Sequence, residues 1–229
     1  MDLAKYPRPL RDSRLGIHAG ANAFFPMGEI DDDIAKMWIP ELLAMGFSWV
    51  KLLSVEESSF REVEELVRVG IEPVVRLYRE TPNPGTLDAS PKTKASVPGL
   101  IARGVHYFEV NNEPNVYWEW INGSIPTYAP IQVAKDYIED ASYIIACGGI
   151  PLIPAMSPGG NWDDMDFLQK FLEHLVREGR LDILDKSAIA CHNAAFNHPL
   201  DYPYDSVNQL GTPVSQEEYD KEQWLMSRD

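Results

Sequence analysis

The chain has 229 residues, of which 45% are hydrophobic and 24% charged, and its formal net charge is -15. This composition is that of a globular protein with a sizeable core, so we expect residues 1–229 to form a single domain. The acidic excess argues against nucleic acid and anionic membranes as partners, because both require a basic surface. It is compatible with a neutral substrate, although an acidic surface that aids solubility is the simpler explanation.

The sequence predicts neither a membrane anchor nor a disulfide framework. No apolar run approaches the roughly 20 residues that cross a bilayer, and residues 1–14 lack the apolar core of a signal peptide. We therefore expect a soluble protein, cytoplasmic, or secreted if a signal has been removed. The 2 cysteines, Cys147 and Cys191, have no redox or zinc spacing and are interpreted as buried small hydrophobic residues.

Short β-rich runs alternate with amphipathic stretches along the chain. Residues 80–98 show no periodicity and are predicted to form a long loop, with a short helix near 99–103. Strands are predicted at 15–19, 48–53, 73–78, 106–111, 150–156 and 187–192. The remaining helices are predicted at 31–45, 58–69, 128–147 and 163–176, with a last one opened by Ser215 and Glu218.

Alternation of strands and helices predicts a parallel sheet, either doubly wound or closed into a barrel. No glycine-rich phosphate loop follows the first strand, and polar residues cluster past several strand ends, where a barrel builds its active site. We therefore predict an α/β fold of the TIM (β/α)8-barrel type, with about six of the eight units present. The missing units indicate a truncated chain or one completed by another polypeptide, and an open barrel would expose edges that favour self-association.

The run Phe108-Glu109-Val110-Asn111-Asn112-Glu113-Pro114-Asn115 is the most informative segment. An apolar strand leads directly into Asn112 and Glu113, and Pro114 ends that strand and holds Glu113 at its rim. Glycoside hydrolysis needs a carboxylic acid that protonates the leaving oxygen, and a nearby amide can bind the sugar 2-hydroxyl. An ordinary turn is the alternative, but the strand-end position and the aromatic residues that follow favour a catalytic role.

On these residues the sequence resembles the clan A retaining glycoside hydrolases, (β/α)8 barrels that include families 5 and 39. The resemblance implies that Glu113 is the general acid/base, that Asn112 binds the 2-hydroxyl and that His192 contacts substrate. It also implies a nucleophilic glutamate after a seventh strand, which this sequence lacks, and Glu217 and Glu218 in the last predicted helix are poor substitutes. The implied function is hydrolysis of O-glycosidic bonds by a retaining two-carboxylate mechanism; a non-catalytic carbohydrate-binding barrel or an inactive fragment is the alternative.

Further residues at strand ends and in loops are candidates for binding a carbohydrate. Arg76 either contacts the sugar or Glu113, or forms an ion pair inside the barrel, and His18 is more often a core histidine than a ligand. Loop aromatic rings can stack on pyranose rings. The complete candidate set is His18, Arg76, Tyr78, Tyr117, Trp118, Trp162, His192 and Asn193.

Of the remaining histidines, His106 is assigned to a strand start and His174 to a helix surface. The spacing of the five histidines matches no compact metal motif, so neither a metal nor another cofactor is expected.

Overall fold

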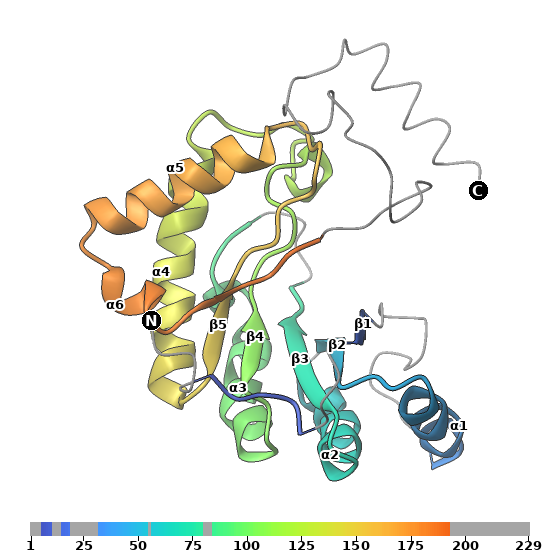
Figure 1. Cartoon of the computed structure of the whole chain (residues 1–229). Helices are drawn as coiled ribbons and strands as arrows, with labels where there is room; N and C mark the ends of the chain where they lie inside the picture. Colours follow the sequence, from blue (N-terminus) through green and yellow to red (C-terminus); the bar gives the residue numbers. More distant parts are fainter. Residues whose placement is uncertain (1–5, 11–14, 19–31, 55, 80–83, 193–229) are drawn as a thin grey trace, which may run out of the picture.

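The computed structural model describes residues 6–10, 15–18, 32–54, 56–79 and 84–192, and their strands form one curled parallel sheet (Figure 1). The strands pair in sequence order, β1 to β6, without a reversal. A doubly wound sheet would reverse its order at a switch point, so the observed order is that of a partial β/α barrel. The strands are β1 (Gly16–His18), β2 (Trp49–Ser54), β3 (Glu72–Leu77), β4 (Tyr107–Glu109), β5 (Ile150–Ile153) and β6 (Ala188–Ile189).

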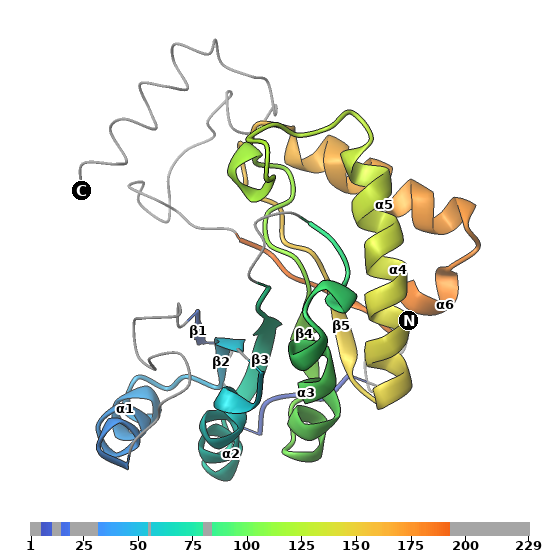
Figure 2. The ribbon, with the colours of Figure 1, turned by 180° about the vertical axis from the view of Figure 1, so that it is seen from behind.

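Helices connect successive strands, and α1 to α4 follow one another along the outer side of the curled sheet (Figures 1 and 2). None of the described helices is both long enough and apolar enough to cross a membrane. The helices are α1 (Asp32–Ala44), α2 (Phe60–Arg68), α3 (Pro91–Ala102), α4 (Ala129–Cys147), α5 (Asp164–Arg177) and α6 (Leu181–Leu184). Short 3-10 turns are η2 (Glu56–Ser59), η3 (Leu87–Ala89) and η4 (Tyr117–Glu119). The α/β parallel sheet predicted from the sequence is therefore confirmed, whereas an eight-stranded barrel stays a prediction.

The two faces of the sheet differ in polarity because successive side chains of a strand alternate between faces. Val75 pairs with Phe108 across β3 and β4, and both side chains are fully buried in the core. The next pair along, Arg76 with Glu109, lies on the opposite face and is charged. The outer face thus carries the apolar core under the helices, and the inner face carries the ionisable side chains discussed below.

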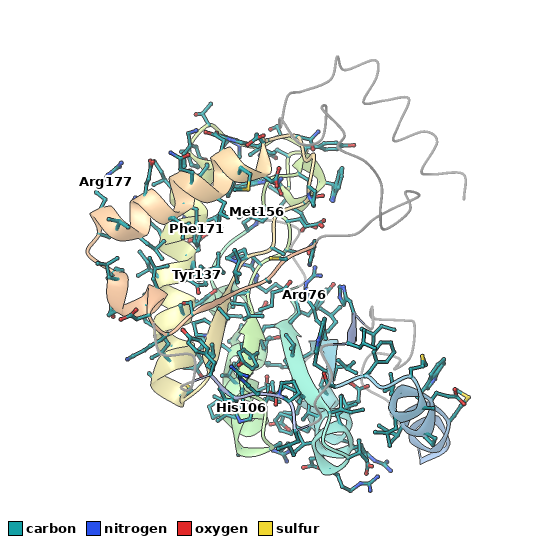
Figure 3. All side chains as sticks on the ribbon, in the orientation of Figure 1. Arg76, His106, Tyr137, Met156, Phe171 and Arg177 are labelled. Atoms are coloured by element: carbon teal, nitrogen blue, oxygen red, sulfur yellow. The ribbon has the colours of Figure 1, made fainter. Side chains whose placement is uncertain are left out.

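Helices α4 and α5 pack through a pair of buried aromatic rings, Tyr137 and Phe171, whose centroids are 5.4 Å apart (Figure 3). The Tyr137 hydroxyl also donates to Ser187 Oγ at 2.7 Å, just before β6, and Ser187 Oγ donates to the carbonyl of Ile183 at 2.8 Å. These contacts fix the last described strand against the helical layer.

The N-terminal segment crosses the amino ends of the strands. The Tyr6 hydroxyl donates to the carbonyls of Asp185 and Ser187 at 2.9 and 3.0 Å, and the Tyr107 hydroxyl donates to the carbonyl of Pro7 at 2.6 Å. Residues 6–10 therefore cover the end of the sheet opposite to the one that carries Glu113.

The prediction of a loop at residues 80–98 is wrong for its second half, because α3 occupies 91–102. Pro91 stands at the start of the helix, where its missing N–H costs nothing. In the first half of α3 the buried face is formed by Thr93 and Ser96, which are 5% and 1% exposed. Small polar residues on the buried face, together with Pro98 inside the helix, conceal the apolar periodicity on which the sequence-based prediction depends.

Two further expectations are corrected. His174 is buried at 5% exposure and does not lie on a helix surface; burial lowers its pKa. Cys191 is exposed and Cys147 only half-buried, so neither is a fully buried hydrophobic residue. Short helix α6 was not anticipated from the sequence, and the helix predicted to begin at Ser215 lies outside the described residues.

We predict that Phe171→Ala lowers the free energy of unfolding by about 3–5 kcal/mol, because it removes a buried ring and leaves a cavity between α4 and α5. Val176→Ala in the same helix is the control, since Val176 is 55% exposed and its truncation should cost less than about 0.5 kcal/mol. Chemical denaturation followed by circular dichroism measures both values. Equal losses in the two variants would contradict the packing described here.

Candidate functional site

Glu113 is presented by a tight turn with unusual backbone geometry. Asn111 and Glu113 have φ angles of 62° and 38°, and they are the only non-glycine residues of the described chain in the left-handed region. Such conformations cost of order 1–3 kcal/mol each and persist only where surrounding contacts enforce them. Strain of this kind concentrates at functional sites, so the turn marks this end of β4 as the candidate site.

Backbone and side-chain contacts with the loop after β5 enforce this turn. The Glu113 N–H donates to the carbonyl of Ala155 at 3.0 Å, beyond the end of β5. The amide of fully buried Asn115 donates to the carbonyls of Ser157 and Trp162 at 2.8 and 3.0 Å. Together these bonds tie the turn after β4 to the loop after β5.

Arg79, just past β3, holds the first residue of the turn. Its guanidinium donates to Asn111 Oδ1, which also lies 3.4 Å from the N–H donor of Gly85. Burial lowers the pKa of Arg79, and the nearby carboxylates of Asp140, Asp136 and Glu119 oppose that shift. A charged donor therefore fixes the side chain of Asn111, whose backbone is strained.

Below the turn, Glu109 is the centre of a buried charge cluster. Its side chain is 0% exposed and forms an ion pair with Lys51 of β2, while Arg76 Nε lies 3.9 Å from Glu109 Oε1. Burial lowers the pKa of Lys51, and the charge of Glu109 together with a hydrogen bond to it opposes the shift. Two cations from the strands on one side of β4 thus compensate one carboxylate that water cannot reach.

His192 connects this cluster to Glu113. Its Nε2 lies 3.0 Å from Lys51 Nζ, and its Nδ1 lies 2.7 Å from Glu113 Oε1. An ammonium group only donates, so Nε2 is the acceptor, and in the neutral ring the proton is on Nδ1. His192 therefore donates to Glu113 Oε1, and the contact chain runs from Glu109 through Lys51 and His192 to Glu113.

His18, at the end of β1, closes the cluster on the other side. Its ring stacks on that of His192, with centroids 6.0 Å apart and planes 29° apart. Burial lowers the pKa of His18 to about 4, and the positive charges of Lys51 and Arg76 add to the shift. His18 is thus a neutral ring at neutral pH, available as a hydrogen-bonding group rather than as a cation.

Asn112 is held by a second carboxylate of the site. Its Nδ2 donates to Glu119 Oε1 at 2.6 Å, and its buried Oδ1 has no hydrogen-bond partner among the described residues. Burial raises the pKa of Glu119, whereas the hydrogen bond from Asn112 and the charge of Arg76 lower it. The contact orients the amide of Asn112 next to Glu113.

The aromatic candidates take different positions. Tyr117 and Trp118 form an edge-to-face pair at 5.1 Å and are 45% and 44% exposed. The indole N–H of Trp162 donates to Asp166 Oδ2 at 2.7 Å and its ring packs on Phe167, so Trp162 is anchored on α5. Tyr78 is half-buried directly after β3.

The structure thus brings four of the sequence-predicted residues into one cluster, namely Glu113, His192, His18 and Arg76, with Asn112 beside it. Asn193 lies outside the described residues. Figure 3 shows Arg76 at the end of β3 that faces this cluster and His106 at the opposite end of the sheet. Arg76 adopts the ion-pair position that was one of its two expected roles, while its side chain is still 22% exposed toward the site.

Three participants were not assigned to the site from the sequence: Arg79, Glu109 and Glu119. The alternation of side chains along a strand could have indicated Glu109, because a charged residue between buried Phe108 and Val110 must face the inside of the curled sheet. Arg79 and Glu119 lie in irregular segments, where no periodicity indicates the direction of a side chain.

Comparisons of this chain with protein-family models, with curated proteins and with solved structures found no match. The site is therefore interpreted from its own geometry. In the part of the chain that the structure describes, no group of three or more His, Cys, Asp or Glu side chains is arranged to hold a metal ion.

We predict that Lys51→Met destabilises the fold by about 3–5 kcal/mol, because removing one partner of a buried pair leaves an uncompensated charge. The double variant Lys51→Met/Glu109→Gln should recover most of this loss, since the carboxylate is then neutral. Urea denaturation of the two single variants and the double variant forms a double-mutant cycle that measures the coupling. Additive losses would show that the pair does not hold the site together.

We also predict that His18 titrates at about pH 4 in the folded protein and near 6.5 in denaturant. Between these values the unfolded chain binds a proton at His18 that the folded chain does not, so this residue lowers stability as the pH falls from 6.5 to 4. Proton NMR of the histidine rings measures the midpoint, with His18→Gln to assign the signal. A folded-state midpoint near 6.5 would contradict the buried, cation-flanked position.

Proposed function

We propose that this chain is a glycosidase-type barrel domain of a protein that hydrolyses O-glycosidic bonds by a retaining mechanism, with Glu113 as general acid/base. The proposal is supported chiefly by the position of Glu113, which a strained and fully tethered turn holds beyond β4 with 21% of its side chain exposed. A carboxyl group at the carboxyl end of a barrel strand is where β/α barrels place catalytic groups. The substrate proposed is a carbohydrate.

The hydrogen bond from His192 engages one carboxyl oxygen of Glu113 and leaves the other free for proton transfer. Oε1 accepts from His192 Nδ1, so the proton that acid catalysis requires belongs on Oε2. In the first step Glu113 Oε2–H would protonate the leaving glycosidic oxygen, and in the second the carboxylate would take a proton from the attacking water. His192 keeps the carboxyl group in one orientation through both steps and is a positioning residue in this scheme.

Asn112 is proposed to contact the sugar 2-hydroxyl. Because its Nδ2 already donates to Glu119, its Oδ1 is the atom left to accept a hydrogen bond from that hydroxyl. Glu119 would then act through Asn112 by fixing the plane of the amide. Hydrogen bonds to the 2-hydroxyl that strengthen in the transition state contribute several kcal/mol in glycosidases, of order a hundredfold or more in rate.

A retaining mechanism also needs a nucleophilic carboxylate about 5 Å from the acid/base. Two carboxylates of the described site are already engaged, Glu109 with Lys51 and Glu119 with Asn112. We therefore do not propose either of them as the nucleophile. The proposal takes that group from outside the described residues, after a strand beyond β6, as the resemblance implies.

Glu113→Gln is predicted to lower the hydrolysis rate of glycosides with poor leaving groups by about 10²–10⁴-fold, the usual contribution of a general acid. Dinitrophenyl glycosides should lose far less in the glycosylation step, because their leaving group departs without a proton. Steady-state kinetics on matched pairs of substrates measures this difference. Glu65→Gln serves as control, because Glu65 pairs with Arg68 on α2 and takes no part in the site described above.

An unchanged rate in Glu113→Gln would refute the assignment. Equal losses for both substrate types would assign Glu113 a role other than acid catalysis. Carbohydrate binding by the whole protein without any turnover would instead favour a non-catalytic binding barrel.

A further inference from the structure

A cleft of about 440 Å3 lies beside the turn that presents Glu113, between the loop after β3 and the first two turns of α4. Two residues that line the cleft contact that turn. The Gly85 N–H lies 3.4 Å from Asn111 Oδ1, and the Trp120 indole N–H donates to the Pro114 carbonyl at 2.9 Å. This volume falls within the roughly 300–1,000 Å3 of small-molecule sites, so the cleft is large enough to hold a ligand next to the candidate active site.

One residue that lines the cleft, Asp136, has a buried carboxylate oxygen without a partner. Asp136 is 7% exposed and its Oδ1 accepts from Gln132 Nε2 at 2.8 Å, but its Oδ2 has no hydrogen bond within the described residues. An unsatisfied buried carboxylate oxygen costs free energy. Burial raises the pKa of Asp136, and the hydrogen bond from Gln132 and the charge of Arg79 counteract the rise. Hydroxyl groups of a ligand would satisfy this oxygen.

The charges around the cleft favour a neutral ligand. Asp136 and the nearby Arg79 carry opposite charges, so neither an anion nor a cation meets a net attractive charge there. The other polar groups that line the cleft are neutral amides and hydroxyls, and two aromatic residues complete the lining. The polar and aromatic residues that line the cleft are Trp120, Asn122, Ser124, Tyr128, Gln132 and Asp136.

We propose that this cleft is a carbohydrate subsite that binds one neutral sugar ring, with Asp136 Oδ2 and the Gln132 amide bonding its hydroxyls. The ring of Tyr128, which is 59% exposed, offers a surface for the apolar C–H side of the sugar. The assignment to a sugar rests on the function proposed above, whereas the charge and hydrogen-bond argument for a neutral polyhydroxyl ligand stands without it. A sugar held here adjoins Asn111 and Pro114, so the subsite would select substrates that extend beyond the bond to be cleaved.

Titration of the isotope-labelled full chain with xylobiose, cellobiose and galactobiose, followed by two-dimensional NMR, tests the subsite. At least one disaccharide should shift the indole N–H of Trp120 and the side-chain amides of Gln132 and Asn122. Asp136→Asn should weaken that binding about 10- to 100-fold, because a charge-assisted hydrogen bond is lost. Gln132→Met, which keeps the length of the side chain, should also weaken it and provides a second variant if Asp136→Asn does not fold.

Glu139→Gln is the matched control, because it removes one negative charge from an exposed position on the same helix. It should leave the affinity unchanged. Unaltered affinity in folded Asp136→Asn or in Gln132→Met, equal weakening by Glu139→Gln, or the absence of shifts in the cleft would overturn the proposed subsite.

Titration and a hydrolysis assay on the unsubstituted protein separate the two proposals. Shifts in the cleft together with no cleavage of any glycoside would support the subsite and refute the proposed hydrolysis. Hydrolysis without shifts in the cleft would refute the subsite alone.

Discussion

The site depends on one buried ion pair, between Glu109 at the end of β4 and Lys51 of β2. A carboxylate without access to water is tolerated only where cations and hydrogen bonds compensate it. Lys51 meets this need and at the same time donates to His192, which in turn donates to Glu113. The charge buried in the sheet therefore determines which tautomer His192 adopts and which oxygen of Glu113 remains free.

A second set of constraints acts on the backbone rather than on charge. Asn111 and Glu113 adopt left-handed conformations, and Arg79 together with the loop after β5 holds them there. Because these contacts come from β3 and β5, the strands on both sides of β4 position the carboxyl group. Rigid support of this kind is what a catalytic group requires, since small displacements of a reacting atom lower the rate steeply.

The sequence predicts the architecture well where apolar residues repeat with a clear period. Helix α4, with Tyr137, Ala141 and Ile144 on its buried face, was predicted almost to the residue, and the parallel sheet follows from the alternation of elements. Helix α3 was missed because Thr93 and Ser96 occupy its buried face. At the site, the Asn-Glu-Pro motif identified the turn, but the direction of the Arg79 and Glu119 side chains depends on tertiary contacts that no local pattern encodes.

Glu113 is proposed to act on the leaving group and on water rather than to attack the sugar itself. The most direct measurement is the anomeric configuration, determined by NMR, of the product that Glu113→Ala forms from an activated aryl glycoside in the presence of azide. Removal of an acid/base carboxyl opens a path for azide to the glycosyl-enzyme, so the account predicts a glycosyl azide of retained configuration. A glycosyl azide of inverted configuration would contradict it, because that product arises when the missing carboxylate is the nucleophile.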